Sequence, residues 1–170
     1  MRFLASSECK ELGAQVEFDV SGISYAATFA YKSRMKEADT VVEHLVDHFG
    51  HFSWALLWAY DFAWGDRSQE DNPLADWRQY AEWRRRQGED RPLYDAPGHR
   101  FEADERATLI EAVKFAIYTG WDGVLVGRPL TCLISLSHHD IIKVQSRHSL
   151  SALAQQLNRE GISQLDLCAP

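Results

Sequence analysis

The stretch FSWALLWAYDFAW, residues 52–64, decides how the rest of this chain is organised. Bulky apolar side chains, starting with Phe52 and Trp54, occupy its even positions, and mostly small side chains, starting with Ser53 and Ala55, occupy its odd positions. This period of two is typical of a β-strand, because successive side chains of a strand point to opposite faces of a sheet. We therefore predict a strand whose aromatic face is buried in the main core.

The main alternative for this stretch is a helix, since Trp54, Trp58 and Phe62 recur at intervals of four residues. A helix would turn the other rings to different sides and leave at least one of them in water, so we favour the strand. Residues 52–64 exceed the usual length of a strand, and we expect a bend or bulge near residues 59–61. The small side chains of the opposite face would let a helix or a partner approach closely.

Composition describes an ordinary globular protein. The chain has 170 residues, of which 45% are hydrophobic and 25% charged, so we expect a single globular domain over residues 1–170. The formal net charge of −7 argues against binding to nucleic acid or to an anionic membrane, and it favours a basic protein as partner. No segment approaches the length and hydrophobicity of a membrane span. The three cysteines show no paired spacing, so neither a disulfide framework nor a zinc knuckle is predicted, and we expect a cytoplasmic location.

Helical and strand patterns alternate along the rest of the chain. Helices are predicted over residues 36–49, 73–87, from Asp104 to the stop at Gly120, and from Ser149 to the stop at Gly161. Further strands are predicted over residues 15–20, 23–31, 124–126, 130–137 and through Ile142 and Val144. The first two should form a hairpin and lie beside the strand at 52–64. Because hairpins outnumber strand–helix–strand units, we predict an α+β fold with a mainly antiparallel sheet of five to six strands and helices packed on it.

One turn allows a prediction of register. If His138 to Asp140 form a three-residue loop, Leu136 lies opposite Ile142 and apolar side chains face each other across the hairpin. A two-residue loop would instead place Ile134 opposite Lys143. We therefore predict the three-residue loop.

A histidine group is the sharpest candidate for a metal site. His44 and His48 lie four residues apart on a predicted helix, a spacing that lets two imidazoles reach one zinc ion, and His51 could supply a third ligand. The segment HLVDH, residues 44–48, resembles the inverted zinc-protease motif, but Asp47 replaces its glutamate base and is shorter by one methylene. Two partly exposed histidines beside an apolar stripe are the simpler and favoured explanation of the pattern. We therefore predict no metal, with a small metal-dependent hydrolase as the alternative.

No other pattern predicts an enzyme. The turn SHHD, residues 137–140, holds the residue types of a hydrolase triad, but neighbours in one turn cannot converge on one reacting atom. The sequence also lacks a nucleophile elbow, a Walker loop and a dinucleotide-binding glycine pattern. We expect no cofactor.

A candidate interface combines acids with aromatic side chains. Asp66, Glu70 and Asp71 lie in one predicted loop after the central strand, and Trp83 lies on the helix that follows. Acids that border aromatic rings are typical of an interface rim around a hot-spot core. We predict that these four residues bind a basic protein.

The prediction for function is a non-enzymatic protein-binding module. In size, acidity and aromatic content the chain is similar to bacterial immunity proteins, which neutralise a basic toxin. That similarity is one of type and rests on no motif. A structural subunit of an assembly is a further alternative, and the sequence leaves the oligomeric state open.

Overall fold

The computed structural model describes residues 1–15, 22–31, 38–62 and 75–165. In these residues the chain forms one antiparallel sheet of eight strands, accompanied by five helices. The predicted α+β class and antiparallel sheet are therefore confirmed, whereas five to six strands was too few. The strands are β1 (Arg2–Leu4), β2 (Tyr25–Ala30), β3 (Trp54–Phe62), β4 (Gly98–Glu102), β5 (Trp121–Arg128), β6 (Cys132–Ser137), β7 (Ile141–Ser146) and β8 (Ser163–Leu165). The helices are α1 (Ser6–Gln15), α2 (Ala38–Phe49), α3 (Ala75–Arg86), α4 (Arg106–Thr119) and α5 (Ser151–Arg159).

The strands follow the order β1-β4-β3-β5-β6-β7-β2-β8, so β3 and β5 lie near the centre of the sheet. The predicted strand at residues 23–31 corresponds to β2, but it pairs with β7 and β8 and not with β3 as expected. Residues 16–20 of the other predicted hairpin strand lie outside the described residues. The strands missed from sequence are β1, β4 and β8, which have three to five residues each and are too short to show a clear alternation.

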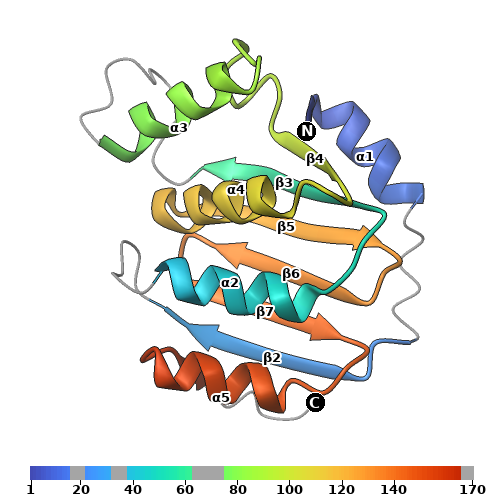
Figure 1. Cartoon of the computed structure of the whole chain (residues 1–170), viewed down its shortest axis with the longest axis vertical. Coiled ribbons are helices and arrows are strands. Elements are labelled where there is room, and N and C mark those ends of the chain that lie inside the picture. Colours follow the sequence, from blue (N-terminus) through green and yellow to red (C-terminus); the bar gives the residue numbers. More distant parts are fainter. Residues whose placement is uncertain (16–21, 32–37, 63–74, 166–170) are drawn as a thin grey trace.

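The five helices of the described residues are divided unequally between the two faces of the sheet, with four on one face and one on the other. The main core joins buried side chains of α2, α3, α4 and α5 to one face, and α2 and α4 lie in front of the sheet in Figure 1. On the other face, a smaller cluster joins Cys9 of α1 to Leu56 and Trp54 of β3. Among the described elements, α1 is the helix that packs on this second face, so much of it is left without a helical cover.

The face of the central strand β3 that enters the main core is the opposite of the one predicted. Ala55, Leu57 and Ala59 belong to the main core, whereas Trp54 belongs to the smaller cluster and Trp58 is only partly buried. Small side chains on β3 let the helical layer approach the sheet closely, and the larger rings are placed on the face with more room. The predicted irregularity is confirmed, because the register with β5 shifts between Ala59 and Asp61.

Local signals gave accurate predictions elsewhere. In the β6–β7 hairpin Leu136 lies opposite Ile142, as the three-residue loop requires, and Asp140 at its end has a positive φ of 61°. The apolar stripe of α2 is buried, and Gly50 directly after the helix has a φ of 81° that favours glycine. No helix in the described residues is long and apolar enough to cross a membrane.

Candidate functional site

The predicted acidic loop lies outside the described residues. Asp66, Glu70 and Asp71 fall within residues 63–74, which follow β3 directly. The last residue of β3, Phe62, lies opposite Trp121 at the start of β5. The chain therefore enters this acidic segment at the end of the sheet where β5 begins.

Trp83 is part of the core of this chain. Its ring is 3% exposed, and its indole N–H donates a hydrogen bond to Glu111 Oε2 at 2.9 Å. The ring stacks on Tyr80 and meets Phe3 edge-on, with centroid distances of 5.9 and 6.2 Å. A ring held in this way on three sides is unavailable to a partner in this conformation, so its position lends no support to the predicted interface.

The three candidate metal ligands have separate surroundings. His44 Nε2 lies 3.9 Å from Glu160 Oε1, beyond the end of α5. His48 Nε2 lies 3.1 Å from the hydroxyl of Ser146 at the end of β7, and His51 is exposed. Within the described part of the chain, no three His, Cys, Asp or Glu side chains are grouped so that they could hold a metal ion.

We expect purified protein to carry no stoichiometric zinc, because these imidazoles are directed toward different partners. Elemental analysis after dialysis against a metal-free buffer measures this directly. One equivalent of tightly held metal that disappears in His48→Ala would instead favour the metal-dependent hydrolase.

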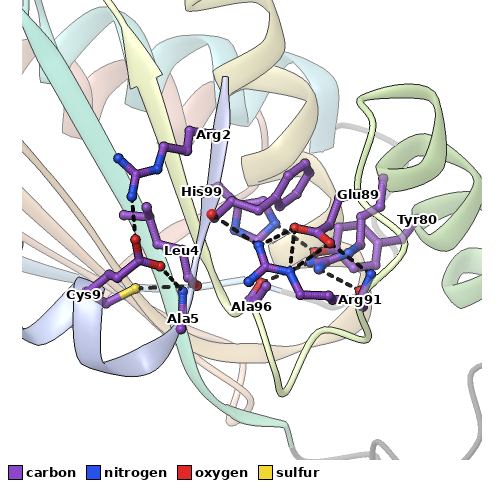
Figure 2. A network of polar contacts seen from close by, with 12 residues as sticks. Arg2, Leu4, Ala5, Cys9, Tyr80, Glu89, Arg91, Ala96 and His99 are labelled. Carbon is purple, nitrogen blue, oxygen red and sulfur yellow. Dashed lines mark hydrogen bonds and ion pairs between the residues drawn. The ribbon is translucent and has the colours of Figure 1, made fainter.

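A buried polar network joins α3, β4 and the segment between them (Figure 2). At its centre Arg84, only 1% exposed, donates hydrogen bonds to the Tyr80 hydroxyl at 2.7 Å and to the carbonyl of Ala96 at 3.2 Å. A third bond runs from its second terminal nitrogen to the carbonyl of Arg91 at 2.9 Å. Its guanidinium carbon lies 4.6 Å from the centroid of the Phe3 ring, a distance at which the cation is attracted to the ring face.

The direction of the hydrogen bonds in this network follows from its acceptors and donors. Because Arg84 can only donate, Tyr80 accepts from it and donates its own proton to His99 Nε2 at 2.7 Å. His99 Nδ1 then donates to the carbonyl of Leu57 on β3 at 3.3 Å. Burial, and secondly the charge of Arg84, lowers the pKa of His99 to about 3, so this imidazole is neutral at pH 7.

A carboxylate next to this network balances its positive charge. Glu89 accepts three hydrogen bonds from the Arg91 side chain, at 3.0, 3.1 and 2.6 Å, and one from its backbone N–H at 2.8 Å. Burial alone would raise the pKa of Glu89, but these bonds and the nearby charges of Arg91 and Arg84 lower it. Glu89 is therefore ionised at pH 7 and offsets part of the cost of burying Arg84.

The network fastens α3 to the sheet and is closed to substrates. Tyr80, Arg84 and His99 are each at most 1% exposed, so none of them can reach a molecule in solvent. The network was not predicted from the sequence, because Arg84 stands in a run of three arginines. The available signal was the spacing of four residues from Tyr80, which places both side chains on one face of a helix.

A second polar cluster closes the β6–β7 turn. Asp122 accepts hydrogen bonds from the backbone N–H and from Nδ1 of His138, both at 2.8 Å. Burial would raise the pKa of Asp122, but the bonds from His138 and a further one from the Ser137 hydroxyl lower it. Since that hydroxyl is directed to Asp122, it is not placed for activation by His138. The cluster clamps the turn to the start of β5.

Large aromatic side chains gather on the sheet face where, among the described elements, α1 is the one helix that packs. Tyr60, at the bulge of β3, is 56% exposed, and its ring meets the partly buried Trp58 edge-on with centroids 6.1 Å apart. Toward the edge of the sheet, the Arg100 guanidinium lies 5.8 Å from the Trp54 ring centroid and forms an ion pair with Glu102 at 3.2 Å. This surface is defined by the exposed Tyr60, the partly buried Trp58 and Arg100, and the largely buried Trp54 that packs beside them, and it is called the aromatic face below.

Comparisons with known proteins identify no relative: no family model matches the chain, and neither the curated proteins nor the solved structures include a significant match.

Proposed function

We propose that this chain is a non-enzymatic protein-binding module whose partner docks on the aromatic face. The observation that carries the proposal is the exposure of Tyr60 beside Trp58, on a side of the sheet that α1 covers only in part. Exposed aromatic side chains next to a packed apolar cluster are typical of the hot spots of protein interfaces.

The aromatic face has the composition of an interface core with a polar rim. Tyr and Trp bury a large area while losing few rotamers, and both carry a polar group that can bond a partner. Arg100 and Glu102 lie beside these rings and would remain near water in a complex. Trp83 is not part of the proposed surface because its ring is buried.

Charge favours a basic partner. The net charge of −7 attracts cationic proteins over a distance set by the screening length, and Asp66, Glu70 and Asp71 follow β3 in the sequence. Such rim and long-range charges act mainly on the association rate, whereas the aromatic side chains hold the complex. An immunity-type inhibitor of a basic toxin, acting in the cytoplasm, fits this combination.

Site-specific cross-linking tests the proposal. A photo-cross-linking phenylalanine analogue in place of Tyr60 is expected to capture a partner in cells, because this side chain would lie in the interface. The matched control is the same analogue at Tyr94, which is 55% exposed, lies in the segment before β4 and is not one of the residues that define the aromatic face. Mass spectrometry identifies the captured protein.

The captured protein is then purified and its affinity measured by titration calorimetry. Tyr60→Ala is expected to weaken binding at least ~tenfold, and Tyr94→Ala to leave it unchanged. Equal capture at both positions, or an unchanged affinity of Tyr60→Ala, would contradict the proposal. Capture of a second copy of this chain would favour the structural subunit instead.

A further inference from the structure

Two histidines and a buried serine meet where β7 leads into α5. Ser146, the last residue of β7, is fully buried. Its hydroxyl oxygen lies 3.1 Å from His48 Nε2 on α2 and accepts the backbone N–H of His148 at 3.0 Å. This hydroxyl therefore connects α2 to the segment 147–150, which carries the chain into α5.

The arrangement suits a neutral His48. Since the Ser146 oxygen already accepts the N–H of His148, its own proton is available to an acceptor, and an unprotonated His48 Nε2 is the acceptor at hydrogen-bond distance. A protonated imidazole has two N–H donors and no acceptor. It would leave the Ser146 proton without this acceptor in a site that water does not reach.

The surroundings of His48 also oppose its protonation. Burial, and secondly the nearby His148, lowers the pKa of His48 below its ordinary value. A histidine that is harder to protonate in the folded than in the unfolded chain stabilises the fold fully above about pH 6.5 and loses that contribution as the pH falls further. The expected change is therefore a loss of local stability in acid.

Other titratable and charged groups lie on or next to the elements that pack together here: His44, Asp47 and His51 on or after α2, Arg106 on α4, Arg147 and His148 before α5, and Glu160 after it. Asp47 is engaged in an ion pair with Arg106. His44 lies beside Glu160, so protonation of His44 would strengthen that contact and oppose any loosening. The acid-sensitive element is thus His48 with Ser146 and His148.

We propose that the hydrogen bond from Ser146 to His48 is a proton-sensitive latch, which holds the segment before α5 against α2 at neutral pH and opens in acid. Opening would loosen the start of α5, whose Leu153 packs in the main core. The latch is independent of the proposed function, because its residues lie apart from the aromatic face.

Hydrogen exchange of the whole protein measures the latch through the His148 amide, which bonds to Ser146. After correction for the intrinsic exchange rate, the protection factor of this amide is expected to fall at least ~fivefold between pH 7.5 and pH 5.5. In His48→Gln the amide oxygen can accept the same Ser146 proton and does not titrate, so the fall should disappear. His44→Gln, one helical turn away, should retain it.

Two results would overturn the latch. One is the same fall in His48→Gln as in the parent protein, which would place the acid sensitivity elsewhere. The other comes from nitrogen-detected NMR of the imidazoles at pH 7.5, where we expect the proton of His48 on Nδ1. A proton on Nε2 would mean that His48 donates to Ser146, and the proposed acceptor would not exist.

Discussion

Arg84→Ala is expected to lower the free energy of unfolding by about 3–5 kcal/mol. The substitution removes the donor for the Tyr80 hydroxyl and for the carbonyls of Ala96 and Arg91, and it leaves a hole beside Phe3. Buried acceptors that lose a charged donor keep the cost of their desolvation, which exceeds the loss of a simple contact. Chemical denaturation followed by tryptophan fluorescence measures the change.

The neighbouring arginine provides a matched control. Arg85 is exposed, so Arg85→Ala removes the same side chain from the same helix and is expected to cost less than about 0.5 kcal/mol. A loss below about 1 kcal/mol in Arg84→Ala would mean that water replaces its hydrogen bonds and that the network does not hold α3.

A double variant shows whether the network acts as a unit. Tyr80→Phe alone removes the hydroxyl between Arg84 and His99. It takes away one acceptor from the Arg84 guanidinium and the donor from His99 Nε2. Combined with Arg84→Ala, it should cost less than the sum of the single losses by about 1 kcal/mol or more, because the second change removes a group already unpaired.

The parts of the fold that sequence predicted are those that depend on neighbouring residues. The apolar stripe of α2 and the end of this helix at Gly50 depend only on residues within a few helical turns of one another. The register of the β6–β7 hairpin follows from one loop length and from the preference of Leu136 for an apolar neighbour. In both cases the competing arrangement exposes large apolar side chains, so the local choice is decisive.

The errors concern contacts between distant segments. The alternation in β3 shows that it has two different faces, but both faces are apolar, and only the placement of the helices decides which one enters the main core. Likewise β4 has five residues and becomes a strand because β1 and β3 pair with its two edges. No local pattern contains that information.

The candidate site was hidden for similar reasons. Burial of Arg84 depends on acceptors supplied by residues 91 and 96 and by Tyr80. The spacing from Tyr80 places Arg84 on the same face of the helix, but it does not show that the other two acceptors lie there. The aromatic stretch did indicate the surface that we propose for binding. Its rings were expected in the main core, and the exposure of Tyr60 became visible only with the helices in place.

Gly98→Ala is expected to lower the free energy of unfolding by about 2–3 kcal/mol, because α1 packs directly over this position. A Cβ on residue 98 would lie 2.2 Å from the sulfur of Cys9 and 3.0 Å from Leu4 Cβ. Cys9 is fully buried, so its sulfur can yield only if α1 moves away from β4. In the parent protein, burial raises the pKa of the Cys9 thiol to about 12. The same movement of α1 would expose this thiol and increase its rate of reaction with a thiol reagent.

Removing the sulfur should reverse most of this effect. Cys9→Ala alone leaves a small hole, yet the Gly98→Ala/Cys9→Ala variant is expected to be more stable than Gly98→Ala, because the new methyl group occupies the vacated space. Gly13→Ala is the control on α1, since a Cβ there meets no atom within 4 Å, and it should be neutral or stabilise by up to about 1 kcal/mol. If Gly98→Ala were as stable as the parent, or if Cys9→Ala failed to relieve it, the close packing of α1 on β4 would be wrong. The aromatic face would then be more widely open than proposed, because α1 is the helix that covers part of it.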